Sequence, residues 1–139
     1  MKRMIALLLV GLALATGCGS ATSSPSAPTS AAKPAAVAKL TAAELLKKVQ
    51  AGEKLLIVDV RTEEEYAAGH IEGAKLITLQ SLPDGAKGLK QNDQIILICR
   101  SGNRSTQAAQ ILVAAGFTNL VNITDGMTGW EKAGGPVVK

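Results

Sequence analysis

Few residues of this chain can stack on nucleic-acid bases or bind a metal ion. Its 139 residues include one tryptophan, one tyrosine, one phenylalanine, one histidine and two cysteines. Base-stacking recognition needs aromatic side chains, and a structural zinc site needs four cysteine or histidine ligands, so the composition argues against both. The formal net charge of +4 arises without a continuous run of lysine or arginine. We therefore expect no nucleic-acid partner, no metal and no cofactor.

The sequence also lacks an apolar run long enough to cross a bilayer. The N-terminal run, Ile5–Ala15, has about eleven residues, whereas a transmembrane helix needs about 20. Lys2 and Arg3 precede this run and small residues follow it, which is the pattern of an export signal. We predict a signal peptide over residues 1–17 and export to the cell envelope.

A cysteine follows the predicted signal directly. Residues 14–18 read LATGC and resemble a bacterial lipobox, although Ala15 stands where leucine is usual. The resemblance implies a lipid on the sulfur of Cys18 and a protein held at a membrane, in the periplasm or on the outer surface. An ordinary signal cleaved near Ala15 is the alternative. Residues 18–38 are rich in serine, alanine, proline and threonine, and we expect them to form a disordered tether.

Residues 39–139 have the alternating pattern of an α/β domain. The aliphatic runs Leu55–Val60 and Gln94–Cys99 are typical of parallel strands buried on both faces. Thr41 and Glu44 form a capping box at the start of one helix, and apolar residues recur at helical spacing over 108–115. Shorter elements are predicted at 75–78, 120–123 and 127–133. Ligands of such sheets bind beyond the carboxyl ends of the strands.

The segment after Cys99 is predicted to be a loop that binds an anion. It reads RSGNRS and leads from a buried strand into a helix, so its N–H groups and the helix N-terminus converge on one centre. Arg100 and Arg104 add formal positive charge. These groups favour the thiolate, and we expect a Cys99 pKa below the free value of about 8.5. Cys99 is therefore a candidate nucleophile, although a single strand cysteine is often an inert core residue.

Four segments resemble signatures of the rhodanese-type sulfurtransferases, in the order in which they occur in that family. The active-site loop is matched by CRSGNRS at 99–105, and DVR at 59–61 and GHIEGA at 69–74 match earlier signatures. The C-terminal segment at 125–137 resembles the end of the family domain. The resemblance covers roughly residues 40–138 and implies an open, parallel, five-stranded sheet flanked by helices.

The resemblance also implies a reaction and a set of site residues. Cys99 would attack the outer sulfur of an anionic donor such as thiosulfate, or of a persulfide, and would hold that sulfur as a persulfide. Cyanide or a thiol would then accept it. The catalytic residue is Cys99, and the substrate-binding residues are Arg100, Ser101, Gly102, Asn103 and Arg104.

Three further residues are candidates for a supporting role. Asp59 and Arg61 lie at the carboxyl end of a predicted strand, and His70 lies in a segment that joins a helix to a strand. A buried aspartate often orients a loop, and a histidine in such a connection is often hydrogen-bonded within the fold, so we favour structural roles for all three. The acidic run Glu63–Glu65 is interpreted as the solvated start of a helix.

Two other functions are compatible with a cysteine loop. One is a cysteine-dependent phosphatase or arsenate reductase, but those loops have five residues between cysteine and arginine, whereas Cys99 and Arg104 have four. The other is a non-catalytic module that binds an anion, sulfide or a protein. A thioredoxin-like oxidoreductase is disfavoured because no second cysteine lies near Cys99. The sequence carries no indication of the oligomeric state.

Overall fold

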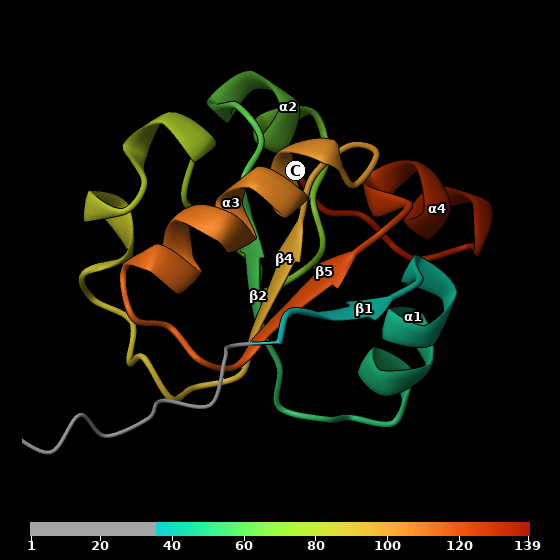
Figure 1. Cartoon of the computed structure of the whole chain (residues 1–139). Helices are drawn as coiled ribbons and strands as arrows, with labels where there is room; N and C mark the ends of the chain where they lie inside the picture. Colours follow the sequence, from blue (N-terminus) through green and yellow to red (C-terminus); the bar gives the residue numbers. More distant parts are fainter. Residues whose placement is uncertain (1–35) are drawn as a thin grey trace, which may run out of the picture. The chain divides into compact units, whose positions relative to one another are not determined.

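The structure, a computed structural model, describes residues 36–139. The predicted signal peptide (1–17), the candidate lipidation site Cys18 and nearly all of the predicted tether (18–38) lie outside the described residues. Strands and helices alternate along the rest of the chain (Figure 1). In chain order they are β1 (Ala38–Leu40), α1 (Ala42–Gln50), β2 (Leu56–Asp59), α2 (Glu63–Ala68), β3 (Lys75–Leu76), the 3-10 turns η1 (Leu79–Ser81) and η2 (Asp84–Ala86), β4 (Ile95–Ile98), α3 (Asn103–Ala114), β5 (Leu120–Ile123) and α4 (Gly126–Lys132).

The five strands form one parallel sheet in the order β1-β5-β4-β2-β3. The predicted open, parallel, five-stranded sheet is therefore confirmed. β4 and β5 are buried throughout because helices cover both faces of the sheet. β1 pairs with β5 and contains Ala38, the residue at which the predicted tether ends. No helix within residues 36–139 has the length and apolar character needed to span a membrane.

Each face of the sheet has its own apolar core. On one face α1 packs against α4, and Leu45 and Trp130 lie in the same cluster as the partly buried Tyr66 of α2. On the other face α3 buries Ala108 and Leu112 against the sheet (Figure 1). Helices α1 and α2 each begin with a capping box, in which the third helical residue is a glutamate. These cores hold the carboxyl ends of β2, β4 and β5 at one edge, where the predicted site residues lie.

Candidate active site

Cys99 lies directly after β4, near the centre of the sheet. Its side chain is 1% exposed and packs with the apolar cluster beneath α3. The next element is α3, whose twelve residues begin at Asn103. The loop of residues 100–102 therefore connects the buried sulfur to the N-terminus of a helix, as the sequence predicts.

The loop directs hydrogen-bond donors at the sulfur. The Gly102 N–H donates to Cys99 Sγ at 3.1 Å, and the Ser105 hydroxyl lies 3.5 Å from the same atom. Gly102 adopts φ +90°, in the left-handed region that favours glycine. A Cβ at this position would also collide with the carbonyl oxygen of Thr124. Glycine is thus required at Gly102 both by backbone conformation and by a close approach to β5.

These donors change the acidity of Cys99. Burial raises the pKa of the thiol, but hydrogen bonds from the Ser105 hydroxyl and from the N–H groups of Ser105, Ser101 and Gly102 lower it by more. The net pKa is below its ordinary value, so the predicted direction is confirmed. Hydroxyl and amide hydrogen bonds are the main groups that lower this pKa. The charge of Arg104 also interacts favourably with Cys99, as the sequence predicts.

Arg104 is held by α2. Its guanidinium donates to both carboxylate oxygens of Glu65, at 2.5 and 2.7 Å. This pair, dominated by the hydrogen bond from Arg104, lowers the pKa of Glu65 to about 2. The structure therefore places the Arg104 fork in an ion pair that joins α2 to the first turn of α3, and does not leave it free for a substrate. The acidic run was predicted to be a solvated helix start, but its Glu65 is the ion-pair partner of the first turn of α3, which follows the cysteine loop.

The N-terminus of α4 supports the other side of the loop. The N–H of Met127 donates to the Cys99 carbonyl at 2.8 Å. Thr128 donates to the Arg100 carbonyl twice, from its N–H at 3.1 Å and from its hydroxyl at 3.0 Å. Gly126 precedes them at φ +56°, where a Cβ would meet the Cys99 carbonyl. The two residues that begin the loop are therefore fixed by α4 through their carbonyl groups.

A cavity of about 350 Å³ opens beside this loop. It lies between α2 and α4, and Arg100 contributes to its wall. Its lining residues are Arg61, Glu65, Ala68, Arg100, Met127, Thr128 and Glu131. Arg100 adjoins Cys99 in the chain and Met127 binds the Cys99 carbonyl, so the cavity borders the cysteine loop, although the buried Cys99 side chain does not itself line it.

Asp59 and Arg61 form a buried ion pair with a structural role. Arg61 donates to the Asp59 carboxylate from its backbone N–H, from Nε and from Nη2, the last at 2.7 Å. Asp59 is completely buried, and Arg61 is 6% exposed. Nη2 of Arg61 also donates to the Gly69 carbonyl at 2.8 Å, so the pair holds the segment after α2 against the end of β2.

His70 is bonded within the fold and does not line the cavity. Its Nδ1 lies 2.9 Å from the Tyr66 carbonyl, and its ring stacks on the Tyr66 ring with centroids 3.6 Å apart. Its backbone exchanges two hydrogen bonds with Val138. These contacts give His70 a structural role near the C-terminus.

Asn122 supports the loop from β5 and was missed by the sequence analysis. It is 4% exposed, and its Nδ2 donates to Thr106 Oγ1 at 2.9 Å. Thr106 Oγ1 in turn donates to the Gly102 carbonyl at 2.8 Å. The chain of hydrogen bonds therefore ends on the residue whose N–H faces the sulfur. A buried asparagine within the aliphatic strand LVNI was the signal that a polar role existed there.

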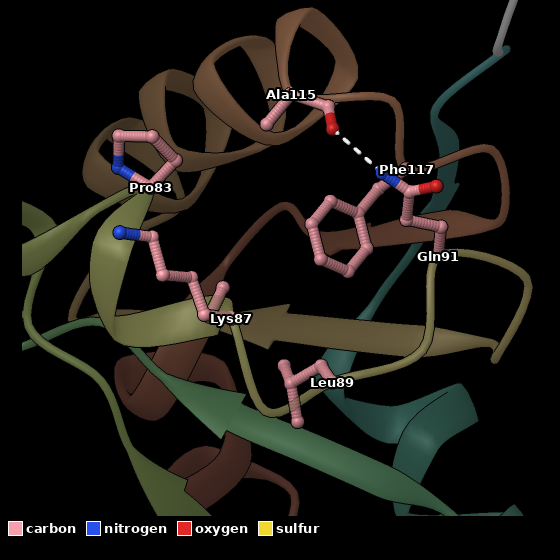
Figure 2. A pocket seen from close by; sticks show the side chains of 7 residues that line it. Pro83, Lys87, Leu89, Gln91, Ala115 and Phe117 are labelled. Carbon is pink, nitrogen blue, oxygen red and sulfur yellow. Dashed lines mark hydrogen bonds between the residues drawn. The ribbon is translucent and has the colours of Figure 1, made fainter.

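A second cavity, of about 380 Å³, lies elsewhere in the domain (Figure 2). It is lined by the segment around η2 and by the residues that follow α3, including Leu89 and Phe117. Gln91 donates to the Ala115 carbonyl at its edge. None of the predicted site residues lines it. Among residues 36–139 there is also no group of three His, Cys, Asp or Glu side chains suited to a metal ion.

Comparison with known proteins identifies one family. The model of the rhodanese-like domain matches residues 41–133. The thiosulfate sulfurtransferase GlpE of Pseudomonas putida (strain GB-1) is 34% identical over 90 residues, which cover 65% of this chain and 78% of GlpE. YrkF of Bacillus subtilis (strain 168) is 42% identical over 84 residues, which cover 60% of this chain but only 45% of YrkF.

A solved structure supports the same relationship. The crystal structure of a rhodanese-like domain protein from Staphylococcus aureus is 36% identical to this chain and superposes with a TM-score of 0.63. The match covers 68% of this chain and 91% of that protein. The residues matched by the family model, 41–133, include the cysteine loop.

Proposed function

The chain belongs to the rhodanese-like domain family, and we propose that it is a sulfurtransferase that carries sulfane sulfur as a persulfide on Cys99. The donor is a small anion such as thiosulfate, or a persulfide, and the acceptor is cyanide or a thiol. Similarity to GlpE, a thiosulfate sulfurtransferase, supports thiosulfate as a donor. The site geometry supports the persulfide step.

One observation carries the proposal: the Gly102 N–H lies 3.1 Å from Cys99 Sγ, with the Ser105 hydroxyl at 3.5 Å. Hydrogen bonds to a sulfur stabilise its anionic form, and the thiolate is the nucleophilic form of cysteine. The same N–H groups would stabilise negative charge on a persulfide, as an oxyanion hole stabilises oxygen. Removing one such donor typically raises a reaction barrier by about 3 kcal/mol.

The first half of the cycle is a displacement at sulfur. The Cys99 thiolate attacks the outer sulfur of thiosulfate, and a new S–S bond forms while the S–S bond of thiosulfate breaks. Sulfite leaves with the electron pair of the broken bond. In the second half the acceptor attacks the outer sulfur of the persulfide, and the electron pair returns to Cys99 as a thiolate.

The position of Arg104 supports sulfur transfer over phosphate chemistry. A cysteine-dependent phosphatase needs a cationic fork that faces the transferred phosphate. In this protein both terminal nitrogens of Arg104 are bound to Glu65. The lowered Cys99 pKa supports a reactive site over a module that only binds.

The test is incubation with thiosulfate followed by intact mass measurement. The protein should gain about 32 Da, the mass of one sulfur on a reactive thiolate, and cyanide should remove it. Cys99→Ser keeps Cys18 and should gain nothing. A wild-type protein that gains no sulfur, or a Cys99→Ser protein that gains as much as the wild type, contradicts the proposal.

We also propose that the domain is held at a membrane by a lipid on Cys18. The support is the LATGC sequence that follows the apolar leader. Metabolic labelling with a fatty acid in a bacterial host should label the wild type, whereas Cys18→Ser should be unlabelled and released from the membrane fraction. Equal labelling of both proteins contradicts this part of the proposal.

A further inference from the structure

Two charged side chains in the cavity beside Cys99 are free to bind a ligand. Arg100 and Glu131 both line this cavity of about 350 Å³. Its other two charged lining residues are already paired, since Arg61 binds Asp59 and Glu65 binds Arg104. Within the part of the chain that the structure describes, neither Arg100 nor Glu131 has an ion-pair partner.

The charges of this cavity sum to zero. Arg61 and Arg100 are positive, and Glu65 and Glu131 are negative. A small dianion in the cavity is attracted by the unpaired Arg100 but repelled by the unpaired Glu131. A molecule that carries one carboxylate and one ammonium group can satisfy both side chains, because Arg100 presents a forked donor and Glu131 presents an acceptor.

Because these charges balance, we propose that the physiological sulfur acceptor is a small zwitterionic aminothiol, an inference that rests on the proposed function. Its carboxylate binds Arg100 and its ammonium group binds Glu131. Ligand cavities range from about 300 to 1,000 Å³, and this one lies at the small end, which suits a molecule of amino-acid size.

The fold ties both binding groups to the cysteine loop. Arg100 follows Cys99 in the chain. Thr128, in the same helix as Glu131, donates two hydrogen bonds to the Arg100 carbonyl. The helix that carries Glu131 and the loop that carries Arg100 are thus bonded to each other. We infer that an acceptor bound by both side chains is reached by the outer sulfur of the persulfide, which extends beyond the buried Cys99 Sγ.

The transfer step is balanced without a further reactant. The anionic Cys99 persulfide first takes the proton of the acceptor thiol, and the acceptor thiolate so formed attacks the outer sulfur of the protonated persulfide, forming a new S–S bond to the acceptor. The bond between the outer sulfur and Cys99 Sγ breaks, and its electron pair remains on Cys99. The products are the acceptor persulfide, which keeps the proton, and the Cys99 thiolate.

The test uses protein that thiosulfate has already loaded with sulfur, and measures the second-order rate at which thiols remove it. Three acceptors are compared: cysteine, cysteamine, which lacks the carboxylate, and 3-mercaptopropionate, which lacks the ammonium group. Glu131→Gln should slow the reaction with cysteine and with cysteamine by about 1.5-fold to fivefold, the range of an exposed ion pair. The reaction with 3-mercaptopropionate should not be slowed. Arg100→Gln should instead slow cysteine and 3-mercaptopropionate more than cysteamine.

Controls separate charge recognition from general effects. Each acceptor is compared with itself across variants, so differences in thiol acidity cancel. Glu63→Gln removes the same charge at the start of α2, outside the cavity lining, and should leave the ratio between acceptors unchanged. Glu131→Asp keeps the charge and should keep the preference for ammonium-bearing thiols.

Equal slowing of all three acceptors by Glu131→Gln, or no slowing with cysteine, would overturn the inference. A wild-type protein that thiosulfate cannot load would instead count against the proposed function itself. The two failures are distinguishable because loading is measured before any acceptor is added.

Discussion

The ion pair between Glu65 and Arg104 joins α2 to the first turn of α3, and its contribution to stability depends on pH. The hydrogen bond from Arg104 lowers the pKa of Glu65 from 4.5 to about 2. A difference of this size corresponds to about 3 kcal/mol of folding free energy at neutral pH. The two side chains are 27% and 28% exposed, and solvent screening reduces the expected value to about 2 kcal/mol.

The substitution Glu65→Gln removes this contribution. The pKa of Glu65 is lower in the folded state than in the unfolded chain. Its stabilising effect is therefore complete above pH 4.5 and is lost as the pH falls to about 2. The free energy of unfolding of the wild type should exceed that of Glu65→Gln by about 2 kcal/mol at neutral pH. This difference should disappear as the pH falls to about 2.

Urea unfolding at a series of pH values measures this difference. Glu53→Gln is the matched control, because Glu53 pairs with Lys48 at the surface with 45% of its side chain exposed. That variant should lose less than about 1 kcal/mol. A wild-type advantage over Glu65→Gln that is equally large at both ends of the pH range would refute the assignment of the stabilisation to the Glu65 charge.

Three other substitutions test the loop and its support. Ser105→Ala removes the largest contribution that lowers the Cys99 pKa, so the midpoint of the pH dependence of Cys99 alkylation should rise. An unchanged midpoint would contradict this role. Gly102→Ala forces an alanine to adopt φ +90° and places its Cβ against the Thr124 carbonyl. It should lower the free energy of unfolding by about 1–3 kcal/mol and abolish persulfide loading. A stable, active variant would show that the loop tolerates other conformations. Asp59→Ala leaves the Arg61 cation buried and unpaired, and should lower the free energy of unfolding, measured with urea, by about 3–5 kcal/mol. The double variant Asp59→Leu with Arg61→Met should restore part of this stability. A loss below about 1 kcal/mol in Asp59→Ala would contradict a structural role for the pair.

Much of the fold was predictable because its central strands are unusual in composition. The aliphatic runs that became β2 and β4, broken only by Asp59 at the end of β2, have no polar face, which is typical of a parallel sheet covered on both sides. β1 was not located from the sequence. It has three residues, Ala38–Leu40, two of them exposed, and it is defined by pairing with β5 far along the chain. Local pattern carries no information on such a pairing.

The site was predictable where its chemistry is local in sequence. Cys99, Gly102 and the helix that follows lie within a few residues, and the direction of the Cys99 pKa shift follows from that arrangement. The role of Glu65 was not predictable from its own segment, because the acidic run also satisfies the first turn of a helix, and its partner Arg104 lies 39 residues away. Asn122 reaches the loop only through tertiary packing of α3 on β5.

The pH dependence of Cys99 alkylation tests the central claim most directly, namely that amide and hydroxyl donors hold the buried sulfur as a thiolate. Protein sampled over a range of pH is treated with iodoacetamide, and the labelled Cys99 peptide is quantified by mass spectrometry, so that Cys18 does not contribute. Limited access to the sulfur slows the reaction at every pH and does not move the midpoint. The account predicts a midpoint below the free cysteine value of about 8.5. A midpoint at or above that value would show that burial outweighs the donors, and would contradict the assignment of Cys99 as the sulfur carrier.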